Sequence, residues 1–175
     1  MPKQDAIALL KADHASVKKL FTEQEKAAKH DSHGRYDGQE KQDTFNQIKA
    51  ALTVHATIEE EIFYPTVKKA RSENVKDEVR EAYEEHKQIK SLLAKIASLT
   101  PADETYDMKI KVLKENVEHH VKEEEGEMFP DAKKFLGEKR LVKLGEQLEA
   151  RKGKLAKNVP PSEQLHGQPA ARTAK

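Results

Sequence analysis

One sequence pattern occurs twice in the chain, 65 positions apart. The segment HATIEEEIFYP at residues 55–65 aligns without a gap with HVKEEEGEMFP at residues 120–130, and the two share a histidine, two glutamates, an aromatic residue and a proline. A looser match relates HASVKKLF at residues 14–21 to HKQIKSLL at residues 86–93, 72 positions apart. These matches indicate a duplicated helical hairpin, in which each half supplies one histidine and then a His-x-x-x-Glu motif.

Helical periodicity surrounds both copies of the pattern. Apolar residues recur every three or four positions, which is the spacing of one buried helix face. The hydrophobic and charged fractions are both 36%, a composition typical of long amphipathic helices. We therefore predict an all-α fold, an up-down-up-down four-helix bundle with an additional C-terminal helix. The predicted helices cover about residues 4–29, 39–64, 74–99, 100–128 and 131–156.

Proline and glycine mark the predicted helix boundaries. The polar stretch at residues 30–38 contains two glycines and separates the first two helices. Pro65 disrupts the second helix, although a further turn through Val67 fits the sequence, and Pro130 separates the fourth helix from the fifth. Thr100, followed by a proline, is typical of the start of a helix.

Six polar residues interrupt the apolar faces of the first four helices. Burying such groups without a partner costs several kcal/mol apiece, so six of them in one core need a common partner. Residues four apart share a helix face, so both side chains of each His-x-x-x-Glu motif point into the same space. The six residues are His14, His55, Glu59, His86, His120 and Glu124.

The depth of the four histidines in the predicted bundle gives an independent indication. His14 and His86 lie ten to twelve residues into their helices, whereas His55 and His120 each lie ten residues before a proline. At the α-helical rise per residue, all four fall about 15–18 Å from the same end of the bundle. Four histidines placed independently in a core would seldom occupy a single layer.

Imidazole and carboxylate donors suit Fe, Mn, Zn or Cu, and the absence of Cys excludes a thiolate site. Six side chains exceed the three protein ligands of a catalytic zinc. They suit two metals, each with two histidines, bridged by the two carboxylates. Such a site leaves coordination positions for a small ligand such as O₂, peroxide or NO. Ferritin-like di-iron bundles use Glu-x-x-His instead.

The pattern H…HxxxE…H…HxxxE over about residues 4–156 resembles the hemerythrin-like (HHE cation-binding) domain. The resemblance implies a four-helix bundle with two Fe ions and an oxo or hydroxo bridge. Matched residue by residue, it implies His14, His55 and Glu59 as ligands in the first half, and Glu59 as one of two bridging carboxylates. The second half supplies His86, His120 and Glu124. The predicted domains are a hemerythrin-like metal-binding domain at residues 1–157 and a disordered, Pro- and Gln-rich tail at residues 158–175.

One position departs from the oxygen-carrying members of that family. Those proteins have a second histidine four residues after the third-helix histidine, and this chain has Lys90 there. The shortage of histidine ligands argues against simple reversible O₂ carriage. It brings the chain closer to the bacterial subgroup for which handling of peroxide and NO has been proposed.

Several further residues have alternative interpretations. His119 is expected to support the ligands or to be exposed, with ligation as an alternative. Glu125 is a rival to Glu124 as the inward carboxylate. Tyr83 either lines the pocket or packs in the core. Packing near the prolines is expected for Tyr64, Phe63 and Phe129, and exposure to solvent for His30, His33 and His166.

The composition also limits the partners. A net charge of +1 argues against nucleic acid and against a polybasic membrane anchor, and no apolar run is long enough to span a bilayer. Without a signal peptide, a cytoplasmic location is expected. The predicted function is binding of, or reaction with, small oxidants in stress defence, as a peroxide-consuming or NO-handling oxidoreductase if the chain is an enzyme. The alternative is a non-catalytic O₂ or iron sensor, carrier or store.

Overall fold

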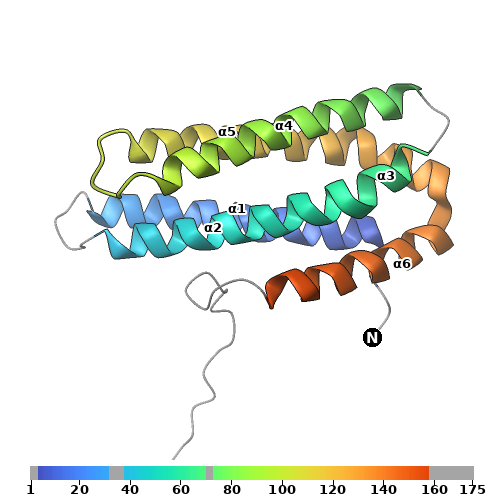
Figure 1. The fold of residues 1–175 in the computed structure, drawn as a ribbon, viewed down its shortest axis with the longest axis horizontal. Coiled ribbons are helices and arrows are strands. Elements are labelled where there is room, and N and C mark those ends of the chain that lie inside the picture. Colours follow the sequence, from blue (N-terminus) through green and yellow to red (C-terminus); the bar gives the residue numbers. More distant parts are fainter. Residues whose placement is uncertain (1–3, 32–37, 70–72, 158–175) are drawn as a thin grey trace, which may run out of the picture.

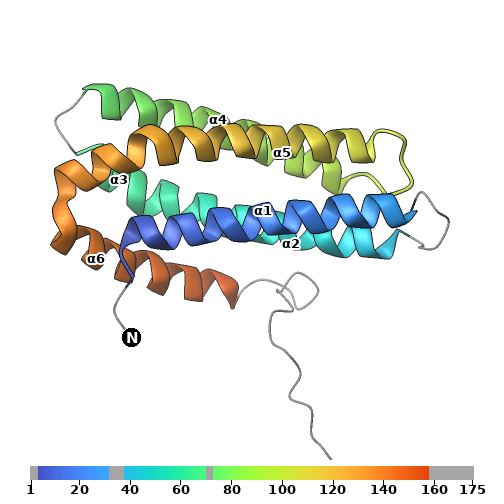
Figure 2. The same cartoon turned by 180° about the vertical axis from the view of Figure 1, so that it is seen from behind.

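The computed structural model describes residues 4–31, 38–69 and 73–157, and all regular secondary structure in these residues is helical. Four long helices run up, down, up and down, with α1 beside α2 and α4 beside α5 (Figure 1). A last helix returns along the outside of α1 and α2, as seen from both sides in Figures 1 and 2. The predicted all-α bundle with an additional C-terminal helix is therefore confirmed. The long helices are α1 (Ala6–Asp31), α2 (Gln39–Ile58), α4 (Glu73–Ala97), α5 (Tyr106–Glu123) and α6 (Phe129–Ala156).

Two wide π-helical turns extend α2 and α5 at the second residue of each His-x-x-x-Glu pair. They are η1 (Glu59–Phe63) and η2 (Glu124–Met128). A proline stands six positions after the glutamate that begins each turn. It has no backbone N–H to donate, and its ring crowds the preceding turn. The backbone N–H just before each proline instead bonds the carbonyl five residues back. Such turns absorb one extra residue and are frequent at functional sites.

Helical structure continues beyond both prolines. The helix α3 (Tyr64–Val67) includes Pro65 and carries the chain one turn further, so the predicted further turn is confirmed. The predicted boundary near Pro130 agrees with the start of α6 at Phe129, although helical turns continue without a gap from η2 into α6. The direction of the chain changes at Gly137, whose φ of 70° is accessible to glycine and strained for other residues.

The start of the fourth bundle helix also differs from the prediction. Thr100 was expected to begin it, but Thr100 and Asp103 form a turn, in which the Asp103 carboxylate accepts hydrogen bonds from the backbone N–H and the hydroxyl of Thr100. A second turn links Tyr106 N–H to the Asp103 carbonyl, and α5 begins only at Tyr106. Local side-chain bonds of this kind compete with regular helix formation.

The apolar core forms two clusters along the bundle axis. One lies where α6 packs, around Leu10, Phe63 and Val79, and the other lies nearer the α1–α2 connection, around Phe21, Phe45 and Leu113. The four buried histidines fall between these clusters in the sequence of the four bundle helices. The predicted single polar layer is therefore present.

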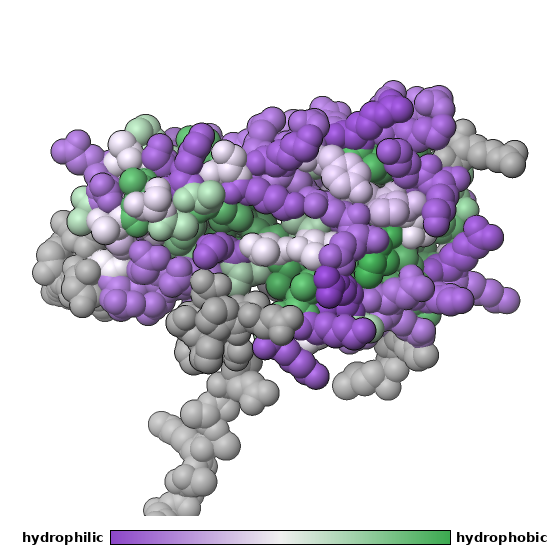
Figure 3. Space-filling view, in the orientation of Figure 1, coloured by the Kyte–Doolittle hydropathy of each residue, from purple (hydrophilic) through white to green (hydrophobic). Residues whose placement is uncertain are grey.

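The surface is largely hydrophilic in the view of Figure 3, and hydrophobic side chains show mainly in the seams between helices. None of the described helices is long and apolar enough to cross a bilayer. The predicted disordered tail at 158–175, together with His33 and His166, lies outside the described residues, as does the side chain of His30.

Candidate metal centre

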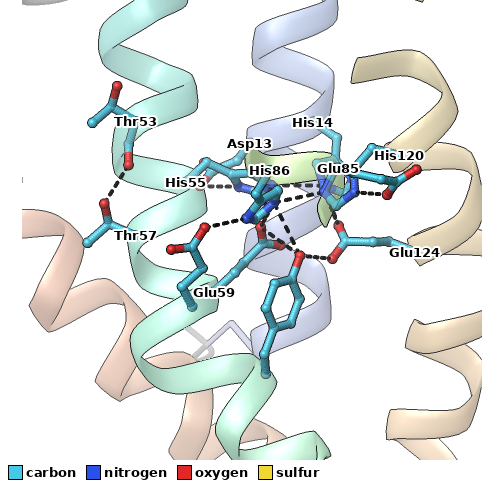
Figure 4. A network of polar contacts seen from close by, with 12 residues as sticks. Asp13, His14, Thr53, His55, Thr57, Glu59, Glu85, His86, His120 and Glu124 are labelled. Carbon is cyan, nitrogen blue, oxygen red and sulfur yellow. Dashed lines mark hydrogen bonds and ion pairs between the residues drawn. The ribbon is translucent and has the colours of Figure 1, made fainter. Parts of the chain in front are cut away.

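Four imidazole rings converge at the middle of the bundle, one each from α1, α2, α4 and α5 (Figure 4). His14 on α1 and His55 on α2 face each other with their Nε2 atoms 3.1 Å apart. His86 on α4 and His120 on α5 form a second pair with the same Nε2 separation of 3.1 Å. All four side chains are buried. The structure thus brings all four predicted histidines together, as two pairs.

The outer nitrogen of each ring faces a carboxylate. His86 Nδ1 lies 2.8 Å from Glu60 Oε1, and His120 Nδ1 lies 2.7 Å from Glu85 Oε2. A second set of such contacts occurs in the other pair. There, His14 Nδ1 lies 2.9 Å from Glu125 Oε1, and His55 Nδ1 lies 3.7 Å from Asp13 Oδ2.

These outer contacts decide which ring nitrogen carries the proton. An ionised carboxylate only accepts hydrogen bonds, so it holds the proton of a neutral imidazole on Nδ1 and leaves Nε2 with a lone pair. In the pair of His86 and His120, two neutral rings of this tautomer would face each other with their Nε2 lone pairs 3.1 Å apart. A cation relieves this repulsion, and metal-bound histidines use the same outer hydrogen bond to fix their tautomer. The donor set therefore fits a metal.

Two fully buried carboxylates join the histidine pairs. Oε2 of Glu59 lies 3.2 Å from Nε2 of His55 and 3.4 Å from Nε2 of His86. Oε2 of Glu124 lies 3.3 Å from Nε2 of His14 and 3.5 Å from Nε2 of His120. Each glutamate thus contacts one histidine of each pair. This is the placement that a bridging carboxylate requires.

The pKa shifts in this layer are those of a buried site that lacks positive charge. Burial and the charge of Glu124 raise the pKa of Glu59 well above its usual range. Burial opposes ionisation of Glu124 as well, but the charges of His120 and His14 outweigh it and lower the pKa of Glu124. Burial lowers the pKa of His55 to about 4, so this ring is neutral at physiological pH. Two carboxylates in one buried site resist ionising together, and a bound cation lets both do so.

The hydroxyl of Tyr64 reaches the centre of the layer, which the sequence analysis missed. It donates to Oε1 of Glu124 at 2.8 Å and lies 3.3 Å from Nε2 of His86. Burial and the charges of Glu124 and Glu59 raise its pKa well above the usual value. Tyr64 packs in the core beside the proline, as expected, and its hydroxyl in addition contacts the buried layer. The signal was available, since the repeated pattern has Tyr in one half where the other half has Phe129.

The remaining candidates surround the layer. His119 is 62% exposed, as expected, and contacts Glu123 rather than the buried rings. Glu125 faces the outer nitrogen of His14, so Glu124 is the inward carboxylate. The Tyr83 hydroxyl donates to the backbone carbonyl of Glu60.

Two further residues contact a histidine of the layer or the carboxylate beside it. Lys90 lies 2.6 Å from the Glu60 carboxylate that bonds His86, so its ammonium supports a ligand from outside the layer. Phe129 stacks on the ring of His14, with centroids 5.7 Å apart, and therefore packs directly against the site.

The model of the hemerythrin HHE cation binding domain matches residues 5–132. The chain belongs to this family. The matched range covers the four bundle helices with both wide turns and ends before Gly137, so most of α6 lies outside it. Family membership and the buried His/Glu clusters together support metal binding, at His14, His55, Glu59 and Glu124 and at Glu59, His86 and His120.

Two individual proteins resemble this HHE domain chain. A crystal structure of a hemerythrin HHE cation binding domain-containing protein from Mycobacterium kansasii superimposes with a TM-score of 0.71 at 24% identity, over 87% of each chain, and shows the shared fold. A DNA nickase of Nostoc sp. (strain PCC 7120) is 28% identical over 151 residues. The match covers 86% of the present chain but only 40% of that relative.

Proposed function

We propose that the chain holds two iron ions in the buried layer and reacts there with a small oxidant, H₂O₂, O₂ or NO, in defence against oxidative or nitrosative stress. The observation that carries this proposal is the position of Glu59 and Glu124, each between the two histidine pairs. Two metals a few ångströms apart, each with two imidazoles and shared carboxylates, keep coordination positions free for a small ligand. Iron, rather than zinc, supplies the one-electron redox chemistry that such a ligand needs.

The residues of the chain divide into three roles in this proposal. His14 and His55 would hold one ion, and His86 and His120 the other, through their Nε2 atoms. The outer carboxylates fix the tautomer and orientation of the rings of His14, His86 and His120. Tyr64 holds Glu124 in place and keeps a proton inside the layer, because burial holds the pKa of its hydroxyl high.

A groove between α1 and α5 gives a small molecule access to this layer. It has a volume of about 650 Å³, and His14 forms part of its wall. Apolar side chains, including Phe21 and Val117, line the groove beside His14, and lysines lie along the same walls. The ligands themselves are buried, so the groove favours small neutral molecules over organic substrates.

The test begins with metal analysis of the purified full chain and its ultraviolet–visible spectrum. Peroxide consumption and NO binding by the iron-loaded protein follow. The expected result is two irons per chain, charge-transfer absorption typical of a bridged di-iron centre, and turnover of peroxide or binding of NO. Fewer than two irons at saturation would overturn the di-iron assignment. Two irons without any reaction would overturn the oxidant chemistry and leave iron sensing, carriage or storage.

A further inference from the structure

A second cluster of metal-binding side chains lies outside the buried layer, on the side of the bundle formed by α4 and α5. A pocket of about 200 Å³ opens there. Six glutamates line it, and neither lysine nor arginine does. The six are Glu78, Glu81, Glu85, Glu123, Glu124 and Glu127.

A further His-x-x-x-Glu motif lies beside this pocket, and its glutamate, Glu123, lines the pocket. His119 and Glu123 are each one position before the buried residues His120 and Glu124, so they repeat the motif about 100° around the helix. Nε2 of His119 lies 3.1 Å from Oε1 of Glu123 and 3.5 Å from Oε1 of Glu85. One nitrogen and two carboxylate oxygens within 4.8 Å of one another make a three-donor set for a divalent cation.

The inner part of the pocket ends at the buried layer. Glu124, 1% exposed, lines the pocket, and its Oε2 atom accepts no hydrogen bond. Glu85 connects the two levels, because one of its oxygens faces His119 and the other lies 2.7 Å from Nδ1 of His120. Carboxylates therefore lie along the path from the exposed cluster to Glu124.

The crowding of these carboxylates is itself unfavourable. Burial raises the pKa of Glu78, and the charges of Asp131 and Glu127 raise it further. Like charges held together in this way attract a cation.

The duplication of the chain provides an internal comparison. With the offsets of 72 and 65 positions, the first-half equivalents of Glu78, Glu81, Glu123, Glu127 and His119 are apolar, whereas those of Glu85 and Glu124 are Asp13 and Glu59. The returning helix α6 packs over that side of the bundle, and several of these residues belong to the core that it closes. The acidic pocket is therefore not a product of the bundle architecture, since the related surface is sealed. The equivalent residues are Ala6, Leu9, Val54, Ile58 and Ile62.

We propose that Glu85, His119 and Glu123 form an exposed divalent-cation site, which captures Fe²⁺ and delivers it through the glutamate-lined pocket to the buried centre. The proposal rests on the proposed function, because iron is the cargo. In this step the iron exchanges its ligands and stays Fe²⁺. Hydrated Fe²⁺ exchanges water for His119 Nε2 and the carboxylates of Glu85 and Glu123, then for the inner carboxylates. Protons held by those carboxylates pass to solvent.

The test measures anaerobic uptake of Fe²⁺ by the metal-free full chain, followed by stopped-flow and by final iron content. We compare wild type with His119→Ala and Glu123→Gln. The matched control is Glu118→Gln, which removes the same charge from the same helix but lines the opposite groove. Electrostatic steering changes uptake rates by about tenfold or more, so Glu123→Gln, which removes a negative charge, should load about tenfold more slowly at low salt. This difference should shrink in high salt. His119→Ala removes a nitrogen donor and no negative charge, so it should slow loading at low and high salt alike. Both variants should reach the wild-type iron content.

A second measurement detects the exposed site directly. With the buried centre filled by Zn²⁺, a Mn²⁺ titration followed by electron paramagnetic resonance should find one weaker ion per chain in wild type and none in His119→Ala. Wild-type uptake rates in both pocket variants would overturn the proposal, as would a reduced final iron content, which would make these residues part of the buried centre. A wild-type chain that takes up no iron at all would overturn the proposed function instead.

Discussion

The phenolic hydroxyl of Tyr64 donates a hydrogen bond of 2.8 Å to Oε1 of Glu124, among the buried histidines and glutamates at the middle of the bundle. Glu124 is 1% exposed, and the Tyr64 bond satisfies the oxygen that does not face the histidines. A hydroxyl in this position both orients the carboxylate and keeps a proton beside it.

Replacing this tyrosine by phenylalanine should therefore destabilise the metal-free protein. The Tyr64→Phe change leaves a buried carboxylate oxygen without a donor, which costs about 1–3 kcal/mol. Denaturant unfolding of the metal-free protein measures this loss. The control is Tyr83→Phe, whose hydroxyl bonds a backbone carbonyl and does not touch Glu124. Equal stabilities for Tyr64→Phe and wild type would show that the bond contributes nothing.

Removing either bridging carboxylate should reduce the metal content below two ions per chain. Glu59→Ala and Glu124→Ala each delete a side chain that contacts one histidine in each of the two pairs. Elemental analysis after loading with excess Fe²⁺ gives the stoichiometry. Glu61→Ala is the control, because Glu61 is an exposed neighbour that pairs with Arg151. Retention of two tightly bound ions in both variants would contradict the bridging assignment.

Metal removal should lower the melting temperature of the protein. The metal-free layer buries facing imidazoles and two coupled carboxylates, and a ligand that binds only the folded state stabilises it by mass action. For structural metals this contribution reaches several kcal/mol. Differential scanning calorimetry of the loaded and the chelator-treated protein checks the difference. Identical melting temperatures would mean that metal binding and folding are not coupled.

The last helix should influence the centre through one lysine. Lys152 on α6 forms an ion pair with Asp13, whose other oxygen faces Nδ1 of His55. Burial opposes ionisation of Asp13, but its contacts with His55 and Lys152 outweigh this and lower its pKa. A lowered carboxyl pKa adds stability that is present above the unfolded-state value and is lost as the pH falls through the folded-state value.

The Lys152→Ala variant should accordingly be less stable than wild type at neutral pH, by at most about 1 kcal/mol because Lys152 is partly exposed. The difference should disappear in acid, below the ordinary pKa of an aspartate. Unfolding curves across this pH range measure both effects. Arg151→Ala is the matched control, since Arg151 forms a surface pair with Glu61 and does not contact the layer. A pH-independent difference would contradict the assignment to Asp13.

A chain that ends at Lys157 should keep its metal and its spectrum. Residues 158–175 show neither apolar periodicity nor ligand spacing in the sequence. Metal analysis of the truncated and full-length chains compares them directly. Loss of iron on truncation would mean that the tail, with His166, takes part in binding.

Spacing alone was sufficient to predict which residues share the polar layer. Two residues four apart on a helix point to the same side whatever surrounds them, so the pairs of His55 with Glu59 and His120 with Glu124 follow from the helical repeat. The depth of His14 and His86 follows from the rise per residue. These inferences depend on local geometry, which the sequence determines closely.

The features that the sequence did not reveal depend on contacts between distant segments. Glu60 and Glu125 each support a histidine on the opposite half of the chain, and no local spacing encodes such a pairing. Pro130 marks the start of α6, as the sequence predicts, but the continuity of the helical turns from η2 into α6 was not evident from it. The reversal at Gly137 was missed because an isolated glycine is a weak signal.

The crossed support of the histidines has a consequence for how such a site could originate. Glu60 comes from the first half and bonds His86 of the second, whereas Glu125 comes from the second half and bonds His14 of the first. Neither hairpin can complete its own set of imidazole contacts. A half-length ancestor would have had to pair with an identical copy to build the layer, and fusion of the two genes would have made that partnership permanent. Only after such a fusion could the two sides of the bundle diverge, one sealed by α6 and the other left open and acidic.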